Sequence, residues 1–272
     1  MLENILTCFG VVCAVGLVSG ILLALASHFF RVEENETVKR VRECLPGANC
    51  GACGYVGCDD YAAAIAGGDA EPNLCIPGGE SAAKGIAEVL GIEVSAVDSK
   101  VAFVNCDGNC KAAEHKAEYI GISSCKAETM LYGGDMACRF GCLGKGDCAA
   151  VCPVNAICIK DDVARINVNL CIGCGKCANS CPKHIISLVP KTAKALNMCN
   201  NKEKGADARR NCKNACIGCK KCEKICQYGA IKVENNLAVI NFDKCTGCGE
   251  CVENCPAKCL KKADLNIGKI GI

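Results

Sequence analysis

CIGCGKCANSCP, residues 171–182, is followed 74 positions later by CTGCGECVENCP, residues 245–256. Each stretch has the spacing C-x2-C-x2-C-x3-C-P. The first three thiols of such a stretch lie on tight turns and face one centre, and the proline turns the chain away after the fourth. The two stretches therefore predict a C-terminal half made of short turns around metal clusters that are held by thiolates.

The offset of 74 residues relates further cysteines. Nine cysteines of the first unit have a cysteine 74 positions later. The pairs are Cys125 and Cys199, Cys138 and Cys212, Cys142 and Cys216, Cys148 and Cys222, Cys152 and Cys226, Cys171 and Cys245, Cys174 and Cys248, Cys177 and Cys251, and Cys181 and Cys255. Each unit also has a hairpin-like segment, AICIKDDVARINV (156–168) or AIKVENNLAVINF (230–242), with a central pair of residues that suits a tight turn. The sequence predicts two tandem modules that arose as an internal repeat.

The module spacing resembles that of bacterial two-cluster ferredoxins. In that pattern three thiols of a run hold one [4Fe–4S] cluster and the fourth crosses to the neighbouring cluster. Applied to the second module, the rule predicts two ligand sets. They are Cys216, Cys219, Cys222 and Cys255, and Cys226, Cys245, Cys248 and Cys251. Gln227 stands where proline is usual, a departure from the pattern.

The first module is less regular. The rule predicts one set directly, formed by Cys152, Cys171, Cys174 and Cys177. For the other set, Lys145 occupies the position that matches Cys219. Three thiols remain for it, those of Cys142, Cys148 and Cys181. The nearby Cys138 is our predicted replacement for the missing fourth ligand, and its substitution by serine tests this hypothesis.

Five further thiols lie near the modules. They are Cys106, Cys110, Cys125, Cys199 and Cys212. Four of them would suffice for a sixth cluster that links the segment before the first module to the spacer between the modules. The alternative is that they are scattered buried cysteines. Cys158 and Cys259 align with Lys232 and Ile185 of the other repeat, so we expect them to be incidental.

A separate cysteine group precedes the repeat. LPGANCGACGYVGC (45–58) contains Cys50, Cys53 and Cys58, and Cys75 follows in NLCIPGG. Its glycines allow tight wrapping around a centre, and residues 59–66 and 81–90 are predicted to form short flanking helices. Four thiolates in this setting predict another [4Fe–4S] cluster, with zinc as the alternative. Cys44 has no assignment.

Near the N-terminus, residues 5–26 form an uncharged and mostly apolar segment that is long enough to span a bilayer. A buried core helix is the alternative, but no comparably apolar partner exists elsewhere in the sequence. Arg31, Lys39, Arg40 and Arg42 follow the segment, so the positive-inside rule predicts a single span with the clusters on the cytoplasmic side. Cys8 and Cys13 are expected to be small apolar side chains within it.

Composition supports the assignment of the thiols as metal ligands. The chain has 30 cysteines among 272 residues, only 4% aromatic residues, no tryptophan and a formal net charge of +2. Without a cleavable signal peptide, this spacing favours clusters in a reducing compartment over disulfides. Nothing indicates nucleic-acid binding. We find no G-x-G-x-x-G after a strand, so we expect no NAD site on this chain, and none of the three histidines has a partner that marks it as an acid/base residue.

The expected fold class is α+β: a transmembrane helix, a small four-cysteine domain and two ferredoxin-like modules. The expected boundaries are 1–30 for the anchor, 31–100 for the N-terminal cluster domain, 101–137 for a connector, 138–190 for the first module, 191–211 for a spacer and 212–272 for the second module.

In this order, LPGANCGACGYVGC, ACRFGCLGKGDCAAVCP (137–153) and the tandem runs resemble the iron–sulfur B subunit of the Rnf complex, an ion-translocating ferredoxin:NAD+ oxidoreductase. The resemblance covers essentially the whole chain. The cysteine groups predict five or six [4Fe–4S] clusters, and the resemblance implies that they take electrons from soluble ferredoxin. It also implies a hetero-oligomeric complex at the cytoplasmic membrane, in which other subunits carry flavin and the NAD site and move Na+ or H+.

Two points stay open at this stage. A polyferredoxin-type subunit of a hydrogenase or another dehydrogenase is the alternative function, and a zinc-dependent scaffold is a third class. Residues 191–224 contain ten basic and three acidic residues. This basic stretch either steers an acidic ferredoxin towards the second module or offsets the negative charge of the clusters.

Overall fold

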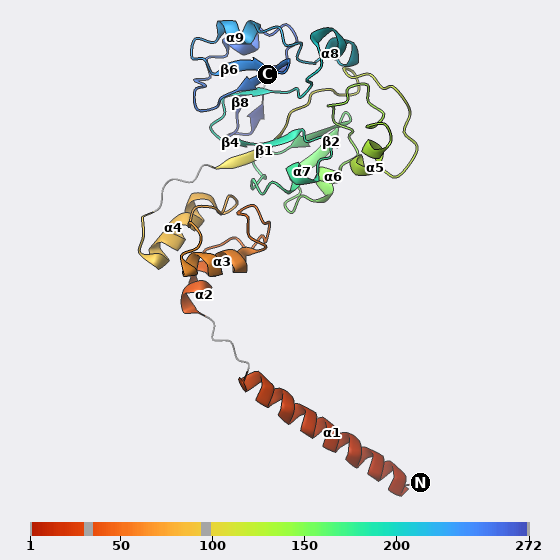
Figure 1. Cartoon of the computed structure of the whole chain (residues 1–272), viewed down its shortest axis with the longest axis vertical. Coiled ribbons are helices and arrows are strands. Elements are labelled where there is room, and N and C mark those ends of the chain that lie inside the picture. The colour runs from red at the N-terminus through yellow and green to blue at the C-terminus, as the bar shows by residue number, and fades with distance from the viewer. Residues whose placement is uncertain (1, 30–34, 94–98, 271–272) are drawn as a thin grey trace.

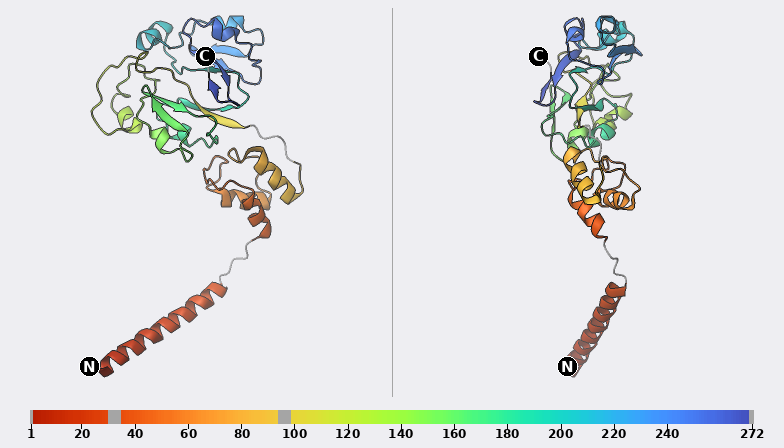
Figure 2. Two further views of the ribbon diagram at one scale, coloured as in Figure 1. Left: turned by 180° about the vertical axis from the view of Figure 1, so that it is seen from behind. Right: turned by 90° about the vertical axis from the view of Figure 1, so that its left-hand side faces the viewer.

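The computed structural model describes residues 2–29, 35–93 and 99–270. The first helix, α1, covers Leu2–Phe29 and stands apart from the rest of the chain in each view (Figures 1 and 2). Among the described residues, no helix is long and apolar enough to cross a membrane. The predicted span, residues 5–26, lies partly outside the described residues, because the side chains of 5–8 and 11–12 are not described.

Three short helices form the small N-terminal domain: α2 (Glu36–Glu43), α3 (Cys58–Gly67) and α4 (Gly79–Leu90). Helix α2 begins at a cap in which Asn35 Oδ1 accepts a hydrogen bond from Thr37 N at 3.0 Å. The helices meet at a compact core that includes Val41, Tyr61 and Ile86, each at most 1% exposed. The helices predicted at 59–66 and 81–90 are confirmed as α3 and α4.

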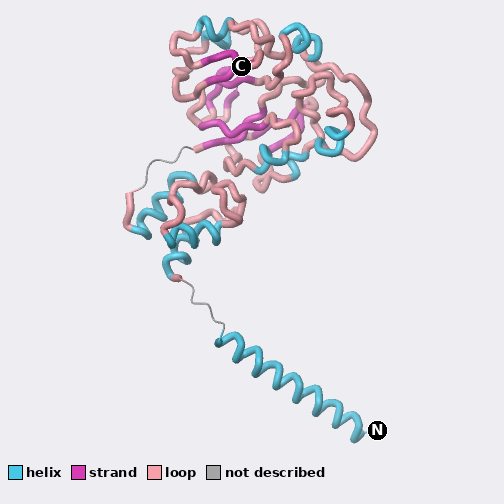
Figure 3. Tube along the Cα trace, in the orientation of Figure 1, coloured by secondary structure: helices cyan, strands magenta, loops and turns pink. Residues whose placement is uncertain are grey.

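The rest of the described chain contains all the strands, as Figure 3 shows. Each repeat has an outer antiparallel pair and an inner hairpin. In the first repeat β1 (Lys100–Val104) pairs with β4 (Ile186–Pro190), and β2 (Ile157–Lys160) pairs with β3 (Val163–Ile166). In the second repeat β5 (Ala195–Asn197) pairs with β8 (Leu260–Asp264), and β6 (Ile231–Glu234) pairs with β7 (Leu237–Ile240). The short strand β9 (Lys269–Ile270) adds to β8.

Both inner hairpins turn at the residues that the sequence indicated. Asp161, Asp162, Asn235 and Asn236 all have positive φ, between 49° and 63°. Two successive residues at positive φ form the type I′ turn, whose twist matches that of antiparallel strands. The predicted hairpins are therefore confirmed in both repeats.

The helices of the repeats are short and lie beside the cysteine runs. They are α5 (Cys125–Met130), α6 (Asp147–Ala150), α7 (Lys176–Ser180), α8 (Gly205–Asn211), α9 (Lys221–Ile225) and α10 (Glu250–Glu253). Cysteine side chains make up much of the two buried clusters at the centre of the repeats. The interior of each repeat thus combines aliphatic side chains with many thiols.

The outer strands of the repeats lie partly outside the predicted module boundaries. Strand β5 lies in the predicted spacer, and β1 lies in the predicted connector apart from its first residue, Lys100. Each pairs with the last long strand of its own repeat. Outer strands were missed because an isolated strand of three to five residues has too short a pattern to be recognised. Each repeat therefore begins at its outer strand, and the connector is a part of the first module.

Candidate iron–sulfur sites

In the second module, one cavity is lined by Cys216, Cys219, Cys222 and Cys255, the four thiols predicted to form one set. Burial, followed by the neighbouring thiols, raises the pKa of Cys222 to about 11. The loop reaches the cavity through Gly218, where φ is +61° and an added Cβ would lie 2.9 Å from the backbone of Asn236. The run therefore packs directly against the hairpin turn.

The other predicted set of this module is also brought together. Burial raises the pKa of Cys251 to about 11, and the nearby thiols of Cys245, Cys248 and Cys226 raise it further. Helix α10 holds Cys251, and the crossing residue Cys226 follows the end of α9. Ala230 N donates a hydrogen bond to Cys226 Sγ at 3.3 Å, the kind of contact that stabilises a cluster thiolate.

The first module contains the matching arrangement. Burial, followed by the thiols of Cys171 and Cys174, raises the pKa of Cys177 to about 11. Cys152 packs in the same buried cluster. Its Sγ accepts a hydrogen bond from Ala156 N at 3.2 Å, which repeats the contact at Cys226.

The irregular site of the first module differs from our prediction. One cavity is lined by Cys142, Cys148 and Cys181 together with Cys125, and Cys138 is not among its lining residues. Burial and then the thiols of Cys142, Cys125 and Cys181 raise the pKa of Cys148 to about 12. The cavity thus has Cys125, from the start of α5, at the place where we predicted Cys138.

Cys138 instead belongs to a group between the repeats, where one cavity is lined by Cys106, Cys138, Cys199 and Cys212. Cys106 Sγ accepts hydrogen bonds from Gly108 N at 3.4 Å and Cys142 N at 3.5 Å. Cys199 Sγ accepts equivalent bonds from Asn201 N at 3.4 Å and Cys216 N at 3.2 Å. Each repeat thus contributes two thiols in the same way.

This symmetry corrects the predicted pairing of the repeats. Cys106 lies two residues after β1, and Cys199 lies two residues after β5. Cys106 is therefore the structural counterpart of Cys199, although the offset of 74 residues pairs Cys199 with Cys125. Of the five thiols predicted for a sixth cluster, Cys106, Cys199 and Cys212 come together; Cys125 lines another cavity, and Cys110 is exposed at the β2–β3 turn.

The four cysteines of the N-terminal domain also come together. Burial raises the pKa of Cys75, and the thiols of Cys58, Cys50 and Cys53 contribute to the rise. Asn49 Oδ1 accepts a hydrogen bond from Cys58 N at 2.8 Å, which fixes the loop at the start of α3. Cys44 does not join this group; its Sγ packs where a side chain at Gly85 would lie.

Neighbouring thiol groups are linked by short contacts. An added Cβ at Gly173, between Cys171 and Cys174, would lie 3.0 Å from Ile76, which follows Cys75. The hydrogen bonds from Cys142 N to Cys106 Sγ and from Cys216 N to Cys199 Sγ join the interface group to both modules. The thiol groups therefore form one continuous series from the N-terminal domain to the second module.

Cys259, which we expected to be incidental, lies at one of these sites. Cys259 is 2% exposed and lines the same cavity as Cys216 and Cys255. Its Sγ lies 3.7 Å from Cys255 Sγ. A hydrogen bond from Cys259 lowers the pKa of Cys255 to about 5 and that of Cys216 to about 6. Because the other repeat has Ile185 here, comparison of the repeats gave no signal.

The donor sets fit the [4Fe–4S] centre that the spacing predicts. Within the described ranges, no group of three or more His, Cys, Asp or Glu converges to hold a single metal ion. Four thiols instead surround a small cavity at three of the sites. A cubane cluster takes one thiolate at each of four iron atoms, so its ligands surround a volume.

Comparison with known proteins agrees with these sites. Residues 45–77 match the family model for an Fe-S cluster, 164–187 match a 4Fe-4S binding domain, and 215–259 match a 4Fe-4S dicluster domain. The chain is 46% identical over 270 residues to the B subunit of the Na+-translocating ferredoxin:NAD+ oxidoreductase complex of Acetobacterium woodii, and the match covers 99% of this chain and 81% of that protein.

Two further relatives are similar over comparable lengths. The B subunit of the proton-translocating ferredoxin:NAD+ oxidoreductase complex of Clostridium ljungdahlii is 41% identical over 255 residues, or 92% of this chain and 90% of that protein. The B subunit of the ion-translocating oxidoreductase complex of Methanosarcina acetivorans is 37% identical over 262 residues, which cover 96% of this chain and 99% of that protein. The chain belongs to the family of Rnf B subunits. The predicted resemblance is confirmed, and a polyferredoxin of another complex is not favoured.

The matched ranges also reflect the irregularity of this Rnf protein. The dicluster model covers most of the second module, whereas the match in the first module begins at residue 164. The unmatched part includes Cys142, Lys145 and Cys148, where the structure departs from the ferredoxin spacing. The 4Fe-4S domains make the chain an iron–sulfur electron-transfer protein.

Proposed function

We propose that this chain carries six [4Fe–4S] clusters, accepts electrons from reduced ferredoxin and passes them to partner subunits that hold flavin and the NAD site. The observation that carries the proposal is the continuous series of six four-thiol groups. The proposed ligand sets are Cys50, Cys53, Cys58 and Cys75; Cys152, Cys171, Cys174 and Cys177; Cys125, Cys142, Cys148 and Cys181; Cys106, Cys138, Cys199 and Cys212; Cys216, Cys219, Cys222 and Cys255; and Cys226, Cys245, Cys248 and Cys251.

Each bound cluster would supply one-electron oxidation and reduction. The chain's own part is to hold four thiolates, exclude water and donate backbone hydrogen bonds to sulfur. Burial raises the pKa of Cys106 to about 12 and that of Cys199 to about 11. These buried thiols must lose protons when they bind iron, so cluster binding and folding of the interface are coupled.

We further propose that residues 5–26 anchor the chain to the cytoplasmic membrane, with the clusters on the cytoplasmic side. Every described side chain from Cys13 to Leu25 is exposed, and Leu17 and Leu23 are 67% and 70% exposed. Exposed apolar side chains around a whole helix are unfavourable in water and suit a lipid environment. Release of a 35–272 variant from membranes, with the full chain retained, would support the anchor; equal behaviour would contradict it.

Ferredoxin, in this proposal, docks on the second module. Cys219 is exposed there, beside Lys220 and Lys221, and further basic residues lie on the surface of the preceding segment. A charged surface next to an exposed cluster ligand would both attract an acidic carrier and bring it close to the iron. The relatives named above translocate Na+ or protons as complexes, and we assign ion movement to partner subunits.

Iron and sulfide analysis of the anaerobically prepared chain, with EPR during a redox titration, tests the proposal. Six clusters correspond to about 24 iron atoms per chain and five to about 20, at four iron atoms a cluster. A colourless protein with bound zinc would contradict an electron-transfer role. About 20 iron atoms, with Cys138→Ser causing no further loss, would contradict the interface cluster alone.

A further inference from the structure

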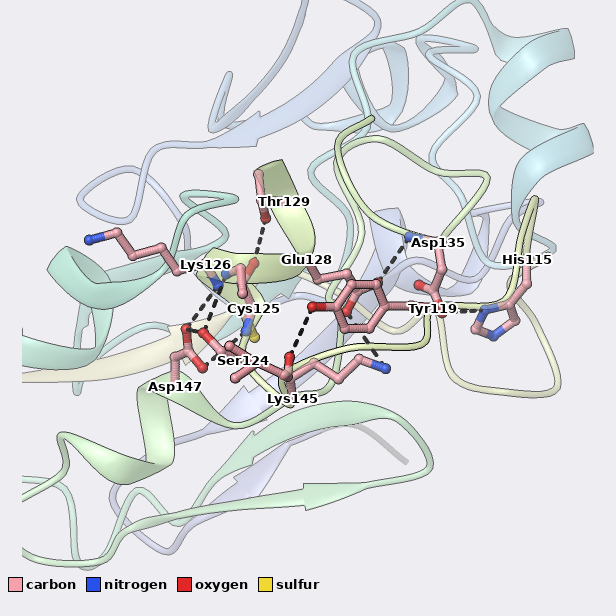
Figure 4. Close-up of polar contacts among 12 residues, drawn as sticks. His115, Tyr119, Ser124, Cys125, Lys126, Glu128, Thr129, Asp135, Lys145 and Asp147 are labelled. Carbon is pink, nitrogen blue, oxygen red and sulfur yellow. Dashed lines mark hydrogen bonds and ion pairs between the residues drawn. The ribbon is translucent and has the colours of Figure 1, made fainter. Parts of the chain in front are cut away.

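Lys145 stands where the second repeat has the cluster ligand Cys219, and its surroundings are unlike those of Cys219. The first repeat is also longer at one place. Cys138 follows Cys106 by 32 residues, whereas Cys212 follows Cys199 by 13, so the first repeat carries 19 additional residues. These residues include helix α5 and the thiol of Cys125. Figure 4 shows the polar contacts that surround this helix.

Asp147 binds the beginning of α5. Its carboxylate accepts hydrogen bonds from the Ser124 hydroxyl at 2.9 Å, Cys125 N at 3.0 Å and Lys126 N at 2.9 Å. These contacts span residues 21 to 23 positions apart and are drawn together in Figure 4. Two of the donors are free backbone N–H groups of the first helical turn, which require an acceptor. Asp147 therefore fixes the backbone of Cys125 next to Cys148.

The other end of α5 is held by an ion pair whose carboxylate is buried. Glu128 is fully buried, and its Oε2 lies 3.6 Å from Lys145 Nζ. Its Oε1 accepts a hydrogen bond from Asp135 N at 2.9 Å, while Asp135 contacts His115 at 3.2 Å. An isolated buried carboxylate is costly, so this group holds the helix only while its partners remain in place.

Lys145 has a second contact within the additional residues. Its Nζ lies 5.7 Å from the centroid of the Tyr119 ring, and its side chain is 27% exposed. Figure 4 shows the lysine extending beneath the tyrosine towards Glu128. The residue that replaced a thiol ligand thus contacts the same inserted segment that brings another thiol to the cavity.

We infer that Asp147 and the Lys145–Glu128 pair are positioning residues that hold Cys125 in the cavity of Cys142, Cys148 and Cys181. In this arrangement the inserted helix supplies the thiol that position 145 lacks. The inference rests on the proposed ligand set for this cluster. It adds that the set is complete only while Asp147 and Lys145 bind the two ends of α5.

The alternative is that these contacts merely fold a surface loop. The two possibilities differ in what a new thiol at position 145 does. If the contacts act through Cys125, a cysteine at 145 should take over when Cys125 is misplaced, because Cys219 fills that position in the second module. If they only fold the loop, a thiol at 145 has no effect on the cluster.

The test uses the full chain, prepared anaerobically, with iron analysis and EPR of each variant. Asp147→Ala should convert one cluster in six from the four-iron to a three-iron form. The three-iron form is visible as a new EPR signal in the oxidised sample. Asp147→Asn keeps one acceptor oxygen and should retain more of the four-iron signal. Glu128→Gln should shift the potential or line shape of the same cluster. Glu118→Gln changes an exposed carboxylate of the same segment and should alter nothing.

Rescue distinguishes positioning from a loss of folding. Lys145→Cys in the Asp147→Ala background should restore the four-iron signal, whereas Lys145→Ala in that background should not. Unchanged EPR spectra in Asp147→Ala and Glu128→Gln would overturn the inference, and so would a loss that Lys145→Cys does not restore. If Cys125→Ala itself leaves all clusters intact, the proposed ligand set is wrong instead. The signals of the second module report folding of every variant.

Discussion

The two modules share a hairpin, an outer strand pair and crossed cysteine runs, but they complete their clusters differently. The second module takes its four thiols from the local spacing, with Cys219 in the run. The first has Lys145 at that place, and its cavity is lined by Cys125 from an inserted helix. The comparison teaches that the position of a thiol in space is retained even where its position in the sequence is not.

The largest expected effect comes from removing the thiols of Cys125 and Cys138, each of which lines a cavity other than the site predicted for it. Cys125→Ser should remove or damage the cluster within the first module, and Cys138→Ser should do the same to the cluster between the modules. Each loss amounts to at most four of about 24 iron atoms. EPR of the reduced protein should show that the two variants lose different signals.

The double variant sharpens this prediction. If the thiols belong to separate clusters, the iron losses of Cys125→Ser and Cys138→Ser should add, because each variant then removes different iron atoms. Loss of the same signal in both single variants would show that the two thiols share a cluster, and the assignment from the cavities would be wrong.

A smaller effect is expected where each cysteine run meets its hairpin turn. Gly144 and Gly218 have φ of +70° and +61°, and an added Cβ would lie 2.5 Å from Asp162 O or 2.9 Å from the Asn236 backbone. Replacement by alanine should cost about 1–3 kcal/mol through backbone strain and should loosen the nearby cluster. The temperature at which cluster absorbance is lost measures this.

The closer approach in the first module predicts the larger loss for Gly144→Ala. Gly54→Ala is a suitable control, because φ is also positive there and nothing lies within 4 Å of the added Cβ. Equal thermal loss in the two module variants and the control would show that the hairpin contacts do not matter.

Sequence could predict the parts of this molecule that local patterns specify. The hairpin turns at Asp161 and Asn235 follow from turn residues between alternating strands, and the grouping of the second-module thiols follows from the run spacing alone. The cavities that Cys125 and Cys138 line could not be predicted in this way. A thiol that is remote in sequence is placed by tertiary contacts such as those of Asp147.

The coincidence of Cys125 with the 74-residue offset also misled the repeat comparison. The additional residues of the first repeat happen to place a cysteine 74 positions before Cys199. The structural equivalence of Cys106 and Cys199 depends on β1 and β5. One signal was present: FVNC (103–106) and LNMC (196–199) both place a cysteine three residues after a large apolar side chain, Phe103 or Leu196.

A subtler difference between the modules is the fifth thiol. Cys259 lies 3.7 Å from Cys255 Sγ, whereas the first module has Ile185 at that position. Hydrogen bonds to ligand sulfurs stabilise the more negative, reduced state and raise the potential of a cluster. One such bond is worth about 1 kcal/mol, or about 40 mV for one electron. Cys259→Ile should therefore lower the potential of the Cys216 cluster by about that amount.

The reciprocal change provides the control. Ile185→Cys should raise the potential of the cluster of Cys142 and Cys181 if its thiol takes the same place. A redox titration followed by EPR measures both shifts. An unchanged potential in Cys259→Ile would show that the fifth thiol packs beside the cluster without influencing it.

The smallest effects are expected at the surface, where the modules differ in charge. Lys221 follows the exposed Cys219, and its counterpart in the first module is Asp147, which is engaged with α5. Arg209 and Arg210 lie on the same basic segment, and the ion pair of Arg210 with Asp207 is largely exposed. Exposed charges act mainly on the association rate, and salt weakens their effect.

Reversal of charge at Arg209 and Arg210 should therefore slow reduction by ferredoxin at low salt by a few-fold and flatten its salt dependence. The same reversal at Lys160 and Lys176 of the first module serves as the matched control and should leave the rate unchanged. Stopped-flow reduction at several salt concentrations measures the rate. If the second-module variant keeps the steep salt dependence, the basic residues offset cluster charge and ferredoxin docks elsewhere. If only the first-module variant is slowed, electrons enter through the module with the inserted helix and not through the second module.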